Sequence, residues 1–278
     1  MIAVVLLIAQ VVTPPPSILP TPVSVSERAV LDRGLADAQA GAQALGGLLG
    51  ASITDLTTGV DAQINGDQPF SMAQVQRLPL AVLVYRQVDA GTLSLAQPVP
   101  AGGSAAPAST LGDLVNRMLI DDDADAENAI MHVLRGEDAI NATLHAHDFD
   151  GIFVESSDGG YASPVALTRL LSEVMTDTLL HSASSDALLA SLAKVTRFPD
   201  GLRAGLRPPA LLQHETGEIV TDDVARVTND VGIAHIPGHV LLIAAMLRDA
   251  GGTERQRESV LAQVARAAVA AATATPGT

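Results

Sequence analysis

Apolar and polar positions along the chain indicate strands near both ends and helices between them. Apolar residues recur at helical spacing over residues 25–45, with Ser26 as the expected N-cap. Residues 51–56 and 60–64 then read as a strand hairpin around a Thr-Thr-Gly turn. Beyond Gly205 the pattern returns to short β-rich segments, predicted as strands at 210–214, 223–227, 231–236 and 240–247. A last helix is expected over 253–271.

The middle of the chain is mostly helical in pattern, with clear helices predicted at 78–90, 111–120, 126–134, 164–175 and 184–192. Strands at both ends with helices inserted between them predict an α+β fold. We expect an antiparallel sheet flanked by the terminal helices, plus an inserted all-helical domain. The expected division gives a discontinuous sheet domain at 24–75 and 205–272, and a helical domain at 76–204.

The N-terminal segment, residues 1–23, has a different character. Residues 1–12 are apolar and uncharged, which is the length of a signal-peptide core and too short to span a bilayer. Residues 13–22 carry five prolines and predict an extended spacer. We therefore expect export to the periplasm or the outside of the cell. An uncleaved apolar anchor or a buried terminal segment remains open.

Composition narrows the function classes. A formal net charge of −15 argues against nucleic acid, whose binding requires a basic face. The absence of cysteine excludes disulfides, thiolate metal sites and a cysteine nucleophile. Aromatic residues make up only 2% of the chain, so the core must be built from aliphatic side chains.

Three segments, in order, carry a resemblance to a known family. They are the stretch 70–79 (FSMAQVQRLP), the run Asp122-Asp123-Ala124 followed by Asn128, and His214-Glu215-Thr216-Gly217. Their order and spacing resemble the three signature motifs of class A β-lactamases, within the penicillin-recognising serine hydrolases. The resemblance covers about residues 52–265 and implies a β-lactamase-like fold.

The resemblance also implies which reactive groups are replaced. The nucleophilic serine would fall at Gln74 and its lysine at Arg77, while serine-aspartate-asparagine would fall at Asp122-Asp123-Ala124. The substrate-binding lysine would fall at Glu215, with Thr216 and Gly217 kept. An amide cannot form an acyl-enzyme, a guanidinium cannot act as a base at neutral pH, and Glu215 would repel a β-lactam carboxylate.

We therefore expect a pseudoenzyme that does not hydrolyse β-lactams and serves a binding or structural role. Its former cleft would be formed by Gln74, Arg77, Asp122, Asp123, Glu215, Thr216 and Gly217. The ligand expected there is an unknown protein partner or a cell-wall-related molecule. We expect a monomer without cofactor or metal. Arg77 is expected to centre a charge network with Asp122 and Glu215.

The alternative is a hydrolase with a rebuilt site, using Ser71 or the carboxylates of Asp122, Asp123 and Glu215. Other motifs favour plainer interpretations. Ser191-x-x-Lys194 lies at a helix end, away from the expected nucleophile segment. His145 and His147 point in different directions on a helix, which favours a surface helix end over a metal site. The run at 121–123 lacks the spacing of a calcium loop and fits an acidic helix N-terminus. Glu155, the acid nearest to a deacylating position, is expected to be a surface residue.

Overall fold

A computed structural model describes residues 25–100, 109–157, 159–207, 209–220 and 227–274. The expected signal segment and proline spacer lie outside the described residues, as does most of the expected strand 223–227. Within the described part, no helix is long and apolar enough to cross a membrane.

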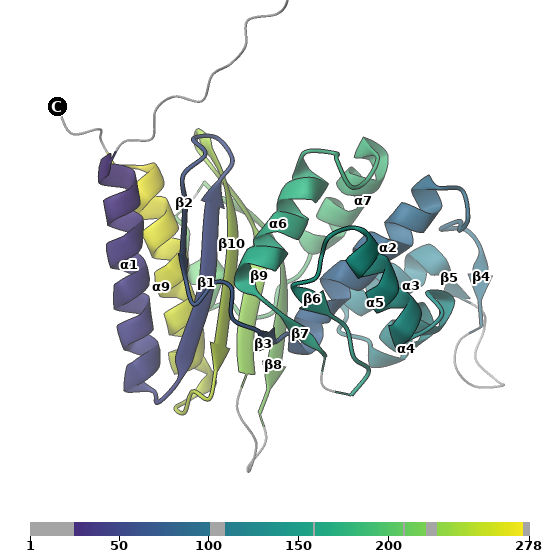
Figure 1. Cartoon of the computed structure of the whole chain (residues 1–278), viewed down its shortest axis with the longest axis horizontal. Helices are drawn as coiled ribbons and strands as arrows, with labels where there is room; N and C mark the ends of the chain where they lie inside the picture. The colour runs from purple at the N-terminus through teal and green to yellow at the C-terminus, as the bar shows by residue number, and fades with distance from the viewer. Residues whose placement is uncertain (1–24, 101–108, 158, 208, 221–226, 275–278) are drawn as a thin grey trace, which may run out of the picture.

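The centre of the fold is a five-stranded antiparallel sheet with strand order β2-β1-β10-β9-β8 (Figure 1). Its strands come from the two ends of the described chain, as the pattern of apolar and polar residues predicts. The bounds are β1 (Leu48–Asp55), β2 (Asp61–Ile64), β8 (Leu211–Ile219), β9 (Val227–Ile236) and β10 (His239–Arg248).

Strand β9 corrects one prediction, because it runs without the break expected after residue 227. Thr228, Asn229 and Asp230 resemble turn residues, yet each is fully buried in the strand. Asn229 donates to the carbonyls of Ser71 and Met72, at 2.8 and 3.0 Å. These hydrogen bonds replace water at the Asn229 side-chain nitrogen, while Thr228 bonds to Glu218 and Asp230 to His214, so the polar residues stay in the sheet.

The helices cover both faces of the sheet (Figure 1). Helices α1 and α9 lie side by side on one face, and α1 begins at Val25, so Ser26 lies inside the helix and is not its N-cap. Short α8 packs on α9. The helices on the other face include α2 and α4, which begin at the first two segments of the family resemblance. The bounds are α1 (Val25–Ala44), α2 (Arg77–Asp89), α3 (Leu111–Ile120), α4 (Ala124–Val133), α5 (Glu137–Ala146), α6 (Pro164–Met175), α7 (Ser182–Leu192), α8 (Leu202–Gly205) and α9 (Glu254–Ala272).

Short elements link the helices to the sheet. A three-stranded sheet joins the segment before α2 to a hairpin in the middle of the chain, in the order β3-β7-β6. The 3₁₀ helix η1 leads directly from β3 towards α2. The bounds are β3 (Phe70–Ser71), η1 (Ala73–Gln76), β4 (Pro98–Val99), β5 (Ser109–Thr110), β6 (Ile152–Phe153) and β7 (Tyr161–Ala162).

The hydrophobic core has two parts, one on each face of the sheet, and β10 belongs to both. Its residues Leu242, Ala244 and Met246 pack with the helices around α2, whereas the alternate positions pack with α1 and α9. A strand buried on both faces needs no polar alternation, which explains its continuous apolar run. The division into two domains stays a prediction.

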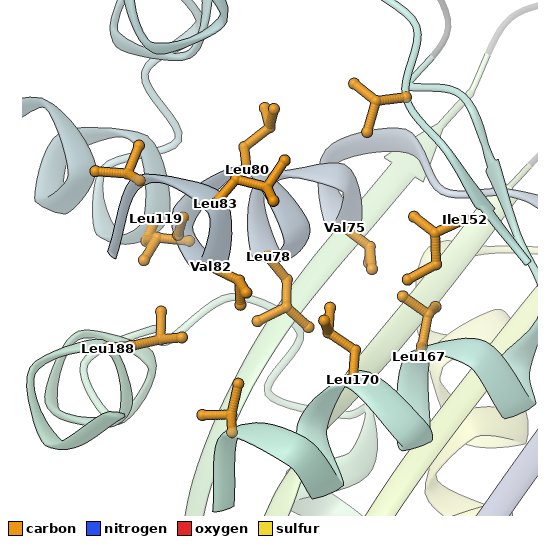
Figure 2. Packing of buried hydrophobic residues seen from close by; sticks show 14 of the residues in the cluster. Val75, Leu78, Leu80, Val82, Leu83, Leu119, Ile152, Leu167, Leu170 and Leu188 are labelled. Atoms are coloured by element: carbon orange, nitrogen blue, oxygen red, sulfur yellow. The ribbon is translucent and has the colours of Figure 1, made fainter. Parts of the chain in front are cut away.

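The start of α2 lies inside the larger of these clusters. Figure 2 shows Val75 and Leu78 directed towards Leu167 and Leu170 of α6. Every residue of α2 from Arg77 to Tyr85 is buried. Arg77 is therefore a cation at the edge of an apolar core, and its charge requires partners.

Candidate functional site

The expected nucleophile position lies where η1 meets the edge strand β8. Gln74 sits in η1 after Ala73, whose backbone is left-handed with φ +49°. The side-chain Oε1 of Gln74 accepts a hydrogen bond of 2.8 Å from the backbone N–H of Glu218 in β8. The amide thus occupies a backbone donor that points at the nucleophile position.

Gly217 allows this close approach of η1 and β8. A Cβ at that position would lie 2.7 Å from the Met72 carbonyl oxygen and 2.8 Å from the Gln74 nitrogen. Both contacts are to backbone atoms, which cannot rotate away. Glycine is therefore required here for packing, whatever chemistry the cleft performs.

Arg77 is held by two carboxylates. Its Nε donates to Glu127 Oε2 of α4 at 2.8 Å, and its Nη1 donates to Asp122. Burial alone would lower the pKa of Arg77, but Glu127 and Asp122 raise it overall. The guanidinium stays charged, and its Nε and Nη1 are already engaged. It cannot serve as a base.

Glu127 also anchors the residue before Arg77. Its Oε1 accepts a hydrogen bond of 2.6 Å from the side-chain amide of Gln76, so one carboxylate fixes two consecutive side chains. The Gln76 Oε1, by contrast, is buried without a hydrogen-bond partner among the described residues.

Glu215 pairs with Arg197 and not with Arg77, which corrects the expected centre of the network. Arg197 lies in the connection between α7 and α8. Its Nη2 donates to Glu215, and its Nε donates to Thr216 Oγ1 at 3.0 Å. The Arg197 Nη1 lies 3.4 Å from Asp122 Oδ1. Asp122 therefore links two guanidiniums.

We call this arrangement the ion chain: Glu127, Arg77, Asp122, Arg197 and Glu215, in spatial order. The contact between Arg77 and Asp122 confirms one expected link. Glu127 and Arg197 were not among the residues expected in the charge network. Two guanidiniums face three carboxyl groups, and the Glu215 side chain is fully buried.

Burial raises the pKa of the Glu215 carboxyl to about 8, against the opposing effect of the Arg197 guanidinium. At neutral pH the carboxyl is then mostly protonated, which leaves two cations facing two anions in the ion chain. A fully buried side chain cannot reach a substrate. Its raised pKa follows first from its burial.

The acidic run before α4 serves the backbone. Asp122 follows α3 in the left-handed region, with φ +60°, which aspartate tolerates better than most residues. Asp123 is the N-cap of α4 and accepts from the backbone of Asp125 and Ala126. The Ala126 N–H, together with Arg117, holds the pKa of Asp123 below its usual range. The expected acidic helix start is confirmed, and no metal-binding cluster occurs among the described residues.

An open cavity of ≈ 300 Å³ adjoins the ion chain. Its walls come from η1, the start of α2, α4 and the hairpin between β6 and β7. Ala124 lines it, whereas Glu155 does not belong to the lining within the described part of the chain. Polar groups in the wall are mainly uncharged, with Arg77 and Glu127 neutralising each other. The polar lining residues are Gln74, Gln76, Arg77, Glu127, Asn128, Ser156 and Ser157.

The other candidate motifs contribute no residue to the lining of this cavity in the described part of the chain. Ser191 is buried in α7 and donates to Asn116, while Lys194 is exposed. His145 pairs with Asp150, and His147 follows the last residue of α5 and contacts Arg86. The histidines thus belong to a surface helix end, as expected. Ser71 lies in β3 opposite Tyr161.

Sequence reasoning missed Glu127 and Arg197, although one signal was present. In α4 the buried residues are Ala126, Glu127, Ile130 and Met131, so an acid occupies the apolar stripe. An acid at such a position requires a buried cation. Arg197 carried no local signal, because its partner in β8 is 18 residues away.

The ion chain predicts unequal coupling energies. At pH 9, where the Glu215 carboxyl is ionised, replacing Arg197 and Glu215 by Gln, singly and together, should give a coupling of about 1–3 kcal/mol, because the two side chains contact each other. The cycle between Arg77 and Glu215 should give less, since Asp122 and Arg197 lie between them. Urea unfolding of the variants measures both.

The exposed pair Arg28–Asp32 is the matched control, with a separation of 2.9 Å and an expected coupling below about 0.5 kcal/mol. A coupling energy for Arg77 and Glu215 as large as that for Arg197 and Glu215 would contradict this order and favour Arg77 as the centre of the charge network.

The raised pKa of Glu215 predicts a loss of stability with rising pH. The folded-state pKa of about 8 lies above the ordinary glutamate pKa of 4.5, so folding favours the protonated carboxyl. This contribution is complete below about pH 4.5 and disappears as pH rises to about 8. Glu215→Gln, which resembles the protonated form, should lack this part of the decline when Tm is measured from pH 5 to 9.

Glu258 supplies the comparison, because burial raises the pKa of its carboxyl to about 7 and causes a decline of its own. Glu258→Gln should leave the Glu215 part intact. Identical pH slopes for the wild-type protein and Glu215→Gln would show that Glu215 is ionised when folded.

Comparisons with known proteins agree with this geometry. A family model described as the beta-lactamase enzyme family matches residues 35–272. Beta-lactamase VEB-1 from Pseudomonas aeruginosa is 22% identical over 234 residues, which cover 73% of this chain and 78% of that protein. A beta-lactamase structure from Chitinophaga pinensis has 26% identity and a TM-score of 0.80, covering 87% of this chain and 100% of that chain.

An ancestral class A beta-lactamase is similar in fold, with a TM-score of 0.78 and 23% identity, covering 87% of this chain and 99% of that chain. The match of the family model extends over the second half of α1, the whole five-stranded sheet, the cleft and α9. The chain belongs to the β-lactamase enzyme family and has the fold of its class A members.

Proposed function

We propose that this protein is a catalytically inactive member of the β-lactamase family that acts by binding a ligand at its cleft. The observation that carries the proposal is the hydrogen bond from the Glu218 N–H to the Gln74 side chain, 2.8 Å long. A serine hydrolase needs a hydroxyl at this position, with free backbone donors for the oxyanion. Here an unreactive amide stands at that position and uses one of the donors.

The ion chain supports the same conclusion for the remaining groups. Arg77 stays protonated between Glu127 and Asp122, so it cannot activate a hydroxyl. Glu215 offers no positive charge to a substrate carboxylate. Its side chain is fully buried, and burial raises its pKa. Loss of the nucleophile or of its base alone lowers the rate by orders of magnitude in serine hydrolases.

The alternative of a rebuilt hydrolase has less support. Asp122 is paired with Arg77 and Arg197, Asp123 caps α4, and Glu215 is fully buried. None of these carboxylates combines access to substrate with freedom from a structural bond. Ser71 precedes η1 within a strand pair and lacks the helix-start position that the family resemblance implies.

The cavity favours an uncharged ligand that donates hydrogen bonds. Gln76 lines the cavity, and its buried Oε1 has no hydrogen-bond partner among the described residues. A rotation of the Gln76 side chain towards the cavity would let this acceptor gain a hydrogen bond from a ligand N–H or O–H. The charged groups of the wall neutralise each other. A ligand carboxylate would thus find no free cation at the position of Glu215. Export, proposed on the apolar run of residues 1–12, would place the protein where cell-wall-related ligands occur.

The test combines acylation and binding on the purified full chain. Intact mass after incubation with benzylpenicillin should show no adduct, and a chromogenic cephalosporin should not be hydrolysed above the buffer rate. An active class A β-lactamase is the positive control. An adduct that disappears in Ser71→Ala would replace this proposal by the Ser71 hydrolase.

Binding is tested with a matched pair, N-acetyl-dialanine amide and the corresponding free acid, by NMR titration of labelled protein. The amide should perturb the side-chain amide signals of Gln74 and Gln76 more strongly than the acid does, because only the acid brings an unpaired negative charge. Preferential binding of the acid would contradict the proposed ligand chemistry.

A further inference from the structure

A second cavity lies on the opposite face of the sheet from the cleft. It has a volume of ≈ 570 Å³, larger than the ≈ 300 Å³ of the cleft cavity. The last turns of α9, the turn between β9 and β10, and the segment after α8 form its walls. We call it the α9 pocket. Its volume is in the range of small-molecule sites.

The walls of the α9 pocket are apolar. Ile236 and Pro237 contribute from the turn, and Val269 and Ala270 from α9. Apolar surface in a concave site stabilises a bound apolar body by removing it from water. The pocket is thus suited to a hydrocarbon chain or a flat ring system, and not to a small hydrated ion.

Two arginines give this apolar pocket a charge preference. Arg207 and Arg266 line it, and both are exposed. Neither makes an ion pair with a carboxylate in the described ranges of the chain, as is also true of Arg33, Arg86, Arg135 and Arg203. Arg266 Nη2 donates only a long hydrogen bond, 3.5 Å, to the Ser259 carbonyl. Although the protein has a formal net charge of −15, this cavity carries two arginines and no acidic residue in its described lining, so it is locally positive.

We propose that the α9 pocket binds a small amphipathic anion, with an apolar body against α9 and one carboxylate or sulfonate at the arginines. Guanidinium groups bind planar oxyanions through paired hydrogen bonds, and the apolar walls account for the rest of the affinity. The sheet separates this site from the cleft. Binding in the α9 pocket therefore requires neither an active nor an occupied cleft.

The test is a fluorescence titration of the full chain with 8-anilinonaphthalene-1-sulfonate. N-phenyl-1-naphthylamine, which has a similar ring body without the sulfonate, serves as the uncharged comparison. The sulfonate probe should bind at one site and more tightly than the uncharged probe. Arg207→Gln with Arg266→Gln should weaken sulfonate binding by roughly tenfold or more, since two charge-assisted hydrogen bonds are lost.

Arg33→Gln with Lys194→Gln is the matched control, because it removes the same charge from exposed positions elsewhere and should change the affinity less than about twofold. Ala270→Trp, at an exposed position of α9, should block both probes. Circular dichroism checks that each variant is folded. Undetectable sulfonate binding up to about 1 mM, or binding unchanged in the double arginine variant or in Ala270→Trp, would overturn the proposal.

Discussion

The cleft depends on one constraint, which is that every buried ionisable side chain must have a partner. Arg77 enters the apolar core at the start of α2 and is held by Glu127 and Asp122. Glu215 enters the sheet at a fully buried position and is held by Arg197. Because Asp122 contacts both guanidiniums, the two pairs form one ion chain. It connects α2, α4, the acidic turn, the connection before α8 and β8.

The backbone of the cleft follows the family frame, while its side chains do not. The left-handed Ala73 and the tight contact at Gly217 still bring η1 against β8. A backbone donor still points at the nucleophile position, but it now bonds to Gln74. Fold and function are therefore separate conclusions for this chain. The fold, the order of the motifs and the family are inferred from most of the chain, whereas the proposed loss of activity rests on a few side chains.

The sequence predicted elements well where local signals were strong. Helices α3 and α6 begin and end at the expected residues, since each has a capping residue and a regular apolar stripe. Strand β9 was misjudged at residues 228–230, because buried polar residues look like turn residues until their distant partners are known. The former-cleft positions followed from the family resemblance. Their pairing did not, because Glu127 and Arg197 reach Arg77 and Glu215 across the fold.

The most direct measurement of the central claim is penicillin acylation of a single variant, Gln74→Ser. This change returns the hydroxyl but leaves the ion chain in place. Arg77 still cannot accept the hydroxyl proton, and no cation stands at position 215 to hold the substrate carboxylate. The account predicts an unchanged intact mass after hours with benzylpenicillin. A penicilloyl adduct at position 74 would contradict it, and would show that the cleft is inactive only for want of its nucleophile.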